Sequence, residues 1–523
     1  MAKQFTCSKD KTVVTTKQGK IRGFQFDGIY TFHGIKYADA KRFQMPTEIE
    51  PYEGVKDALA YGYCCPMLHQ DQPSMEVFVP HRYWPMDERC QYLNIWSPSL
   101  EKDAKKPVMV WLHGGGYSSG SSIEHICYEG DHLSQYGDVV VVSLNHRLNI
   151  LGYLDLSAYG EKYKNSGNAG NADIVMALKW IHDNIAAFGG DPENVTLFGQ
   201  SGGGMKVYNM MNTPEADGLF HKGIIQSGVA DTKLVTEGDA SYIIEALLKE
   251  LKIKKKDIAK LETIPYAQLA EAYNKVAPAL AEEGKYVGNG PIANEWYMGD
   301  PREVGFTEHA KTIPVMIGTV FGEFDFGQAR EGRSTMTRKA ALAQLEKHFG
   351  KDTKKIVQLY EAAYPGKKLI DLDSIDTFFR PASIDFVEKK AQHPESPVYS
   401  YQFTFEFPLE EGKPAWHCSE IPYVFHNSDR AALYNVPGVT DILEERLSGA
   451  WVNFARYGNP NVGSLPAWPA CEPGVENVMI LDRECEVRVN FDHALLKLVE
   501  KYAQNPFDKK KEEEDEEEKL LLH

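Results

Sequence analysis

The sequence predicts an α/β fold in which a large, mostly parallel central sheet is flanked by helices. Three observations support this: apolar runs without alternation, amphipathic segments between them, and a length of 523 residues, which is enough to bury such a sheet. Continuous apolar runs are typical of parallel strands covered on both faces, and the helices between them supply the crossover connections. The runs assigned to these strands are 108–112, 139–142, 195–198, 224–225 and 313–317.

The N-terminal part has a different pattern, with short β-like runs separated by turn residues. These runs are 12–15, 20–24 and 29–32. Their spacing predicts a small antiparallel sheet.

Helical periodicity is clearest over residues 172–181, where apolar residues recur at helical spacing before Gly189-Gly190. Residues 232–285 and 335–395 read as amphipathic helices rich in Lys and Glu. No flexible linker separates them, so we interpret them as insertions in a single domain of residues 1–507. The charged run 508–523 is typical of a disordered tail.

Charge and composition exclude several classes of protein. The chain has 74 acidic and 57 basic residues, a formal net charge of −17, which argues against nucleic acid as a partner. No apolar run reaches the roughly 18 residues of a membrane span, so no membrane association is expected. The first residues lack the apolar segment of a secretory signal, so a cytoplasmic location is expected, although secretion after processing is not excluded.

Cysteine usage indicates neither a disulfide scaffold nor a zinc site, because the eight cysteines include no C-x-x-C pair. Cys64, Cys65 and Cys90 are close enough in sequence for one disulfide, but free thiols are favoured in a reducing compartment. We expect no metal and no organic cofactor. The sequence does not indicate an oligomeric state.

The strongest chemical signal is the segment Gly199-Gln200-Ser201-Gly202-Gly203. It follows the run 195–198 and precedes a helical stretch near Met205, which is the strand–turn–helix order of a nucleophile elbow. Flanking glycines let the turn hold the serine in a strained conformation. A phosphate loop would need Lys directly after Gly204, where Met205 stands and Lys206 is one place late.

A second glycine-rich segment, His113-Gly114-Gly115-Gly116-Tyr117, ends the apolar run 108–112. Three consecutive glycines are costly in chain entropy and fit a loop whose backbone N–H groups approach a developing oxyanion. We assign the N–H donors to Gly115, Gly116 and Gly202.

A nucleophilic serine needs a base, and the base needs an acid; the chain order for this fold is serine, acid, histidine. Glu323 and Asp325 both follow the apolar run 313–317, and position alone does not choose between them. His417 is the favoured base because it comes after the acid, on a loop beyond the strand-like residues 398–405. His426 and His113 are weaker candidates.

Further segments along the chain carry the residue pattern of one known family: 33–38, 42–43, 90–95, 113–117, 145–148, 188–192, 199–203, 226–228, 420–425 and 451–456. In these segments the chain resembles the type-B carboxylesterase family, which includes bacterial esterases, animal carboxylesterases and cholinesterases. The bacterial carboxylesterases are the most similar group. The resemblance implies an α/β-hydrolase fold and a serine carboxylesterase.

The resemblance also implies roles for individual residues. It places the acid at Glu323 and the base at His417, and it matches Ser227 to a serine that supports the triad by hydrogen bonding. Cys65 and Cys90 match the first disulfide of the family.

Three departures from the family pattern lie beside the expected site. Gln200 replaces the usual Glu, so His417 should depend more on Glu323 for stabilisation of its protonated form. Gly202 replaces the usual Ala, which keeps the N–H donor but leaves the loop less constrained. Phe324 replaces the usual Gly, and the sequence gives no account of its effect.

The expected reaction is hydrolysis of a small-molecule ester through an acyl-enzyme, with activity falling on acidification through roughly pH 6–7, the range of a histidine base. Amide or thioester hydrolysis on the same triad is one alternative. A non-catalytic adhesion scaffold is another, but it usually lacks the serine or the histidine. Aromatic side chains that could line an acyl or alcohol pocket, although such residues more often serve in packing, are Phe78, Trp84, Tyr117 and Trp416.

Overall fold

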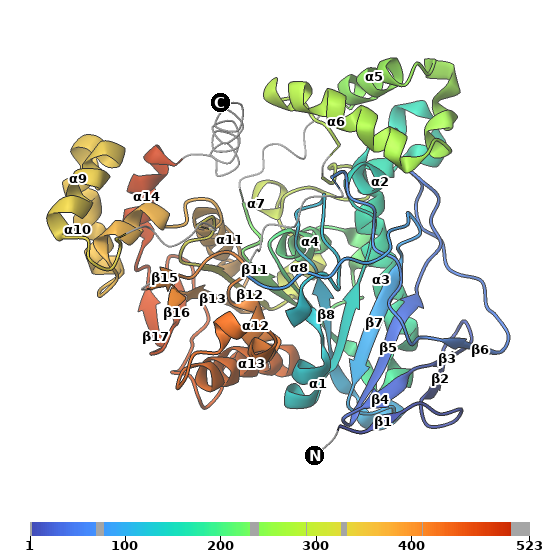
Figure 1. Ribbon diagram of the computed structural model, residues 1–523, viewed down its shortest axis with the longest axis horizontal. Helices are drawn as coiled ribbons and strands as arrows, with labels where there is room; N and C mark the ends of the chain where they lie inside the picture. The colour runs from blue at the N-terminus through green and yellow to red at the C-terminus, as the bar shows by residue number, and fades with distance from the viewer. Residues whose placement is uncertain are drawn as a thin grey trace.

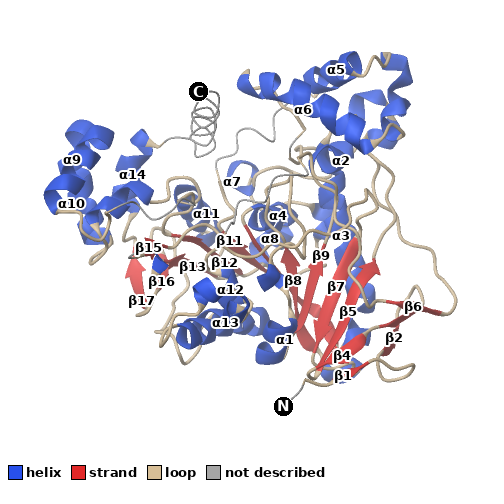
Figure 2. Ribbon diagram, in the orientation of Figure 1, coloured by secondary structure: helices blue, strands red, loops and turns tan. Residues whose placement is uncertain are grey.

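The fold is built on a long, twisted sheet that runs through the molecule (Figures 1 and 2). This computed structural model describes residues 3–69, 78–230, 240–288, 290–325, 332–409 and 412–503. Within these ranges the sheet has 12 strands, in the order β1-β4-β5-β7-β9-β8-β10-β11-β12-β13-β16-β17. Neighbouring strands from β9 to β16 are parallel, as the continuous apolar runs predicted.

The strands of the large sheet have the following bounds, in sheet order: β1 (Phe5–Thr6), β4 (Phe24–Phe26), β5 (Ile29–Lys36), β7 (Tyr92–Ser97), β9 (Val140–Leu144), β8 (Lys106–Leu112), β10 (Gly190–Gln200), β11 (Lys222–Gln226), β12 (Val315–Val320), β13 (Val398–Phe403), β16 (Asn477–Leu481) and β17 (Glu486–Val489). The helices are α1 (Asp131–Gly137), α2 (Asn149–Tyr153), α3 (Ala169–Asn184), α4 (Gly202–Met210), α5 (Ser241–Glu250), α6 (Tyr266–Glu282), α7 (Pro301–Val304), α8 (Glu308–Thr312), α9 (Arg338–Phe349), α10 (Thr353–Ala363), α11 (Arg380–Ala391), α12 (Ile421–Val424), α13 (Thr440–Tyr457) and α14 (His493–Val499). No helix in the described part of the chain combines the length and apolar character needed to cross a membrane.

Both faces of the sheet are buried, which explains why its central strands are apolar without alternation. Trp111 of β8 faces a core that includes Trp451 of α13, whereas the next residue, Leu112, faces a second core that includes Ile174 of α3. Successive side chains of a strand point to opposite faces, so one apolar run serves both cores.

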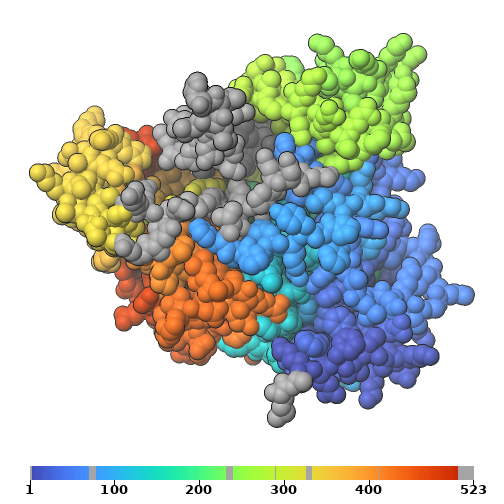
Figure 3. Space-filling view, in the orientation of Figure 1, coloured from blue at the N-terminus to red at the C-terminus, as the bar shows by residue number. Residues whose placement is uncertain are grey.

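The predicted helical insertions form two projections, one around α5 and α6 and one around α9 and α10 (Figure 3). The third helix of the second region, α11, instead packs directly on β12 and β13 and belongs to the layer that covers the sheet. Residues 231–239, where the first predicted insertion begins, and the charged run 508–523 lie outside the described residues.

The small N-terminal sheet differs from the prediction. It consists of β2 (Val13–Thr15), β3 (Lys20–Arg22) and β6 (Val55–Asp57), and only β2 and β3 are antiparallel, since β6 pairs with β3 in parallel. The predicted strand 29–32 is part of β5 and lies in the large sheet, because it pairs with β7, far along the chain. A further two-stranded sheet joins β14 (Glu406–Phe407) and β15 (Lys413–Pro414).

Parallel pairing brings the carboxyl ends of β8, β10, β12 and β13 to one edge of the sheet. Polar groups that follow these strands are therefore neighbours, as is usual in open α/β sheets. The segments after β8, β10 and β12 contain His113, Ser201 and Glu323.

Candidate active site

Ser201 occupies a strained turn between β10 and α4. Its φ of 57° and ψ of −127° lie where only glycine is comfortable. Its N–H donates to the carbonyl of Gln226 at 2.8 Å, and its own carbonyl accepts from the N–H of Met205 at 2.9 Å. The predicted steric need for glycine is clear at Gly203, where an added Cβ would lie 1.9 Å from the carbonyl oxygen of Leu112.

Glu323 and His417 form a buried hydrogen-bonded pair. The Nδ1 atom of His417 lies 2.5 Å from Oε2 of Glu323, and the N–H of His417 donates to the carbonyl of Glu323 at 3.0 Å. Asp325, the other candidate acid, lies 3.8 Å from the ammonium of Lys413 instead. Of the two candidate acids, Glu323 is the one for which a hydrogen bond to His417 is observed.

The second oxygen of Glu323 is held by two donors. Ser227 Oγ donates to Oε1 at 2.5 Å and the N–H of Val320 donates to it at 2.8 Å. Burial raises the pKa of Glu323, and these two hydrogen bonds act against that rise. Burial has the opposite effect on His417 and lowers its pKa, because the charged form of histidine is the protonated one and removal from water disfavours it.

Gln200 links the serine turn to the imidazole. Its Nε2 lies 3.2 Å from Nδ1 and 3.3 Å from Nε2 of His417, while its Oε1 accepts from the thiol of Cys418 at 3.2 Å. The hydrogen bonds of the described residues include none between the Ser201 hydroxyl and His417. Such contacts are often long before substrate binds.

The glycine-rich loop after β8 lies against the start of α4. Gly115 and Gly116 have φ values of +86° and +59°, which favour glycine. An added Cβ on Gly202 would lie 2.3 Å from the carbonyl oxygen and 2.4 Å from the nitrogen of Gly116. The missing methyl of Gly202 is therefore what permits this close approach, while the expectation of a less constrained loop stays a prediction.

Sequence reasoning assigned no role to two buried acids near His417. Asp376 accepts from the N–H groups of Phe378, Phe379 and Arg380 at 2.8, 3.1 and 2.7 Å, and burial raises its pKa to about 7. Its position just before α11 was the available signal, since acidic residues commonly satisfy the first N–H groups of a helix.

The second buried acid, Glu420, accepts from Nε2 of Gln226 at 3.0 Å, and burial raises its pKa to about 7. Gln226 in turn accepts from the indole of Trp451 at 3.0 Å. Glu420 lies three positions after His417 in the sequence, but nothing in that spacing predicts the contact with Gln226.

Two aromatic rings stack on the imidazole. The ring of Phe324 lies 5.7 Å from that of His417 with 15° between the planes, and the ring of Phe379 lies 5.4 Å away with 3° between the planes. The departure at Phe324 thus adds apolar cover to the histidine. Phe378 packs edge-on against both phenylalanines.

The four aromatic pocket candidates lie in three different surroundings, because Phe78 and Trp416 are neighbours. Trp416 has no exposed surface and packs on Phe407, so it is part of the core and does not line an open pocket. Phe78 packs on Trp416. The hydroxyl of Tyr117 accepts from Asn209 at 2.6 Å, beside α4.

Trp84 lines a cavity of about 970 Å³ between the N-terminal segment and α6, with Arg42, Glu88 and Tyr266. Neither the serine nor the His417–Glu323 pair contributes to its lining.

Cys65 and Cys90 are buried free thiols in this structure. Burial and a hydrogen bond with Cys65 raise the pKa of Cys90, so the two side chains are in contact. Their predicted proximity is observed, and they are not bridged.

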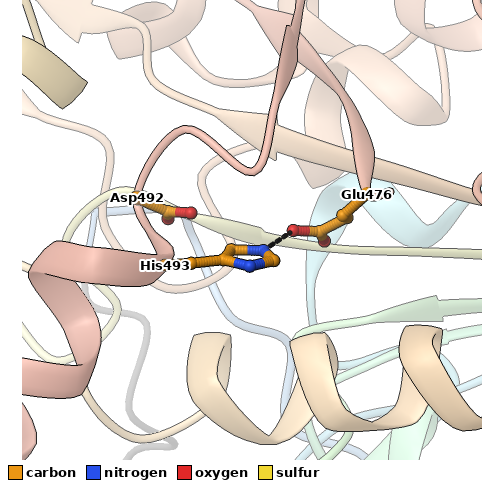
Figure 4. A group of neighbouring side chains, drawn as sticks. All are labelled: Glu476, Asp492 and His493. Carbon is orange, nitrogen blue, oxygen red and sulfur yellow. Dashed lines mark hydrogen bonds and ion pairs between the residues drawn. The ribbon is translucent and has the colours of Figure 1, made fainter. Parts of the chain in front are cut away.

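In the part of the chain that the structure describes, Glu476, Asp492 and His493 form a group of potential metal ligands (Figure 4). The guanidinium of Arg380 donates to both oxygens of Glu476 at 2.7 and 2.8 Å and to both oxygens of Asp492 at 2.9 and 2.8 Å. Both carboxylates already pair with this one guanidinium, so we interpret the group as an internal ion-pair network.

Known proteins provide an independent comparison. A model of the carboxylesterase family matches residues 10–498. The chain is 34% identical over 487 residues to para-nitrobenzyl esterase of Bacillus subtilis (strain 168), covering 91% of this chain and 96% of that protein. It is 31% identical over 490 residues to phenmedipham hydrolase of Pseudarthrobacter oxydans, with 91% and 96% covered.

Solved structures give the same picture. An esterase from anaerobic Clostridium hathewayi, described as able to hydrolyze aliphatic aromatic polyesters, matches with a TM-score of 0.93 and 52% identity, covering 96% of this chain and 100% of that one. A thermophilic PNB esterase matches with a TM-score of 0.74 and 29% identity, covering 93% and 99%.

Proposed function

Because the chain belongs to the carboxylesterase family and is a carboxylic ester hydrolase, we propose that it cleaves esters with Ser201 as nucleophile, His417 as base and Glu323 as acid. The family, the α/β-hydrolase fold and the enzyme class agree with the predictions from sequence. The residue roles and the reaction steps below are our proposal.

One observation carries the proposal: a histidine held by a buried carboxylate beside a strained serine turn. The 2.5 Å contact from His417 Nδ1 to Glu323 fixes the imidazole so that Nε2 is the acceptor, and Gln200 links the ring to the turn that carries Ser201. A carboxylate on Nδ1 sets the tautomer and stabilises the imidazolium that forms when Nε2 takes a proton.

In the first half-reaction the Ser201 oxygen forms a bond to the ester carbonyl carbon while its proton passes to Nε2 of His417. The carbonyl oxygen becomes an oxyanion that accepts hydrogen bonds from the N–H groups of Gly115, Gly116 and Gly202. The carbon–oxygen bond to the alcohol then breaks, and His417 gives its proton to the departing alcohol.

In the second half-reaction water attacks the acyl-enzyme. His417 takes a proton from the water, the same N–H groups hold the new oxyanion, and the bond to Ser201 breaks as the serine recovers the proton. The products are a carboxylic acid and the free enzyme.

For the substrate we propose small esters with an aromatic part. The Clostridium hathewayi esterase acts on aliphatic aromatic polyesters, and in this chain Phe324 and Phe378 are partly exposed beside the imidazole. Thioesters are a second candidate class, since the chain is 30% identical to a fatty acyl-CoA hydrolase of Anas platyrhynchos. Rates across matched oxygen esters, thioesters and amides of benzoate and butyrate distinguish these classes.

Replacement of the serine tests the reaction. Ser201→Ala should lower kcat for p-nitrophenyl butyrate by about 10⁴-fold or more, because no other group supplies the nucleophile. An organophosphate should label Ser201 in the wild-type protein, as mapped by peptide mass spectrometry.

Ser134→Ala is the matched control, because Ser134 is a buried serine of α1 that donates to the carbonyl of Val139 at 2.8 Å. This variant should keep wild-type kcat. A burst of p-nitrophenol from Ser201→Ala, or an adduct on another residue, would overturn the assignment.

A further inference from the structure

Lys206 is a buried lysine in α4, five residues after Ser201, and its exposed surface is 0%. Its ammonium donates to the carbonyl oxygen of His113 at 3.0 Å. Lysine is almost never fully buried, because the loss of hydration is costly, and an apolar side chain would fill the same space at less cost. The presence of a buried ammonium group here therefore indicates that its hydrogen bond has a function.

The bond between Lys206 and His113 joins the two parts of the proposed oxyanion hole. His113 begins the glycine-rich loop that supplies the N–H groups of Gly115 and Gly116. Lys206 belongs to the helix whose first residue, Gly202, supplies the third N–H.

Steric contact limits how closely the glycine-rich loop can approach α4, but it does not limit how far the two can separate. The backbone of Gly116 lies so near Gly202 that an added Cβ would be 2.4 Å from its Cα, and an added Cβ on Gly203 would be 1.9 Å from the carbonyl of Leu112. These contacts prevent closer approach, but they do not prevent the loop from moving away. A hydrogen bond from α4 to the His113 carbonyl opposes that movement.

The ionisable side chains that interact with Lys206 include His113, His146 and Glu124. The rings of His113 and His146 are buried and stack with centroids 5.1 Å apart, and burial together with Lys206 lowers both of their pKa values. Burial lowers the pKa of Lys206 to about 7, while Glu124 acts to raise it. Protonated or neutral, the amine keeps an N–H for the His113 carbonyl, and the protonated form makes the stronger bond.

We propose that Lys206 is a positioning residue of the oxyanion hole, which holds the His113–Gly116 loop against the N-terminus of α4. It acts through the loop and does not touch the substrate. The inference rests on the proposed function, because it presumes that the N–H groups of Gly115, Gly116 and Gly202 bind the oxyanion.

The test replaces Lys206 by Met, which keeps the length and the packing of the side chain but removes the donor. We expect kcat per active site, counted by organophosphate titration, to fall about 10- to 100-fold with KM within about three-fold, since small misplacement of catalytic groups has effects of this size. The affinity for a trifluoromethyl ketone, which forms an oxyanion adduct with the serine, should fall by the same factor as kcat/KM.

Lys390→Met is the matched control. Lys390 is also fully buried and donates to a backbone carbonyl, that of Lys311, at 2.9 Å, but it lies in α11. This variant should show a comparable change in Tm with no change in kcat or in affinity for the ketone. Lys206→Gln is a second variant, whose amide is one bond shorter and uncharged, and it should change activity in the same direction.

Two results would overturn the inference. One is a folded Lys206→Met or Lys206→Gln protein with kcat per active site within two-fold of wild type. The other is a loss of kcat without any loss of affinity for the ketone. Failure of the proposed function is a separate outcome, because Ser201→Ala would then keep its activity.

Discussion

At the scale of single residues, Gln200 is the neighbour of Ser201 that contacts both ring nitrogens of His417. A neutral amide at this place does not favour the charged imidazolium, and burial lowers the pKa of the histidine. Since the neutral ring is the base, activity should persist below the ordinary histidine pKa of about 6.5. The acid limb is therefore expected below the range of pH 6–7 that the sequence alone suggested.

We predict that Gln200→Glu moves the acid limb of kcat/KM to higher pH by about one unit. A carboxylate beside the ring favours the imidazolium, so it raises the pKa of His417 and removes the neutral base at a higher pH. The measurement is the pH dependence of kcat/KM for a neutral ester. Gln200→Met has neither charge nor amide, and a limb that moves upward equally in both variants would contradict the electrostatic explanation.

We also predict that Gly202→Ala lowers kcat by about 10- to 100-fold. The new methyl would overlap the backbone of Gly116, so the loop must shift, and shifts of about 1 Å in a catalytic group have effects of this size. Steady-state kinetics with p-nitrophenyl butyrate measure the loss.

Gly223→Ala is the control for Gly202→Ala, because Gly223 is buried in β11 and its added Cβ would meet only Val207, at 3.3 Å. It should change kcat little. Wild-type kcat in Gly202→Ala would mean that the loop yields without loss of its donors.

At the scale of elements, Arg380 joins α11 to the segment before β16 and to the start of α14. Burial alone would raise the pKa of Glu476, but Arg380, His493 and Ser400 bring it down to about 2. The stabilising contribution of Glu476 is therefore complete above its ordinary pKa and is lost as the pH falls toward 2.

We predict that Arg380→Met lowers the free energy of unfolding by about 3–5 kcal/mol, because it leaves two buried carboxylates without their counter-charge. Guanidinium unfolding at pH 7 measures the change. Arg338→Met is the control, since Arg338 pairs with Glu361 at the surface, where water and salt screen the pair, and its loss should change the free energy of unfolding much less. Equal losses in the two variants would contradict the role of burial.

Local pattern predicted the central strands and several helices because apolar runs and helical periodicity are properties of neighbouring residues. The sheet that each N-terminal strand joins was not predictable in this way, since β5 pairs with β7, whereas β6, which lies between them in sequence, joins the small sheet. The same limit applies to the site. The turn at Ser201 is visible as a motif, whereas the partners of Asp376, Glu420 and Lys206 depend on chain segments that meet only in the folded protein.

At the scale of the whole molecule, a formal net charge of −17 should affect how charged substrates approach. We predict that a cationic ester has a higher kcat/KM than an anionic ester of the same size at low ionic strength. The ratio should shrink as salt is raised from about 10 to 150 mM, because the Debye length falls from about 30 to 8 Å. A neutral ester of the same shape is the control and should show little salt dependence. A ratio that does not change with salt would show that contacts in the site, and not the field of the protein, discriminate between the two esters.

The edge strands of the large sheet affect whether the protein aggregates at high concentration. On one side β1 has two residues, and on the other β17 carries Glu486 and Arg488, which pair with each other. A long, flat, uncharged edge strand can pair with a strand of another chain through its free backbone groups. Short or charged edge strands oppose such pairing. We therefore expect that the protein does not form fibrils through the edges of this sheet at high concentration.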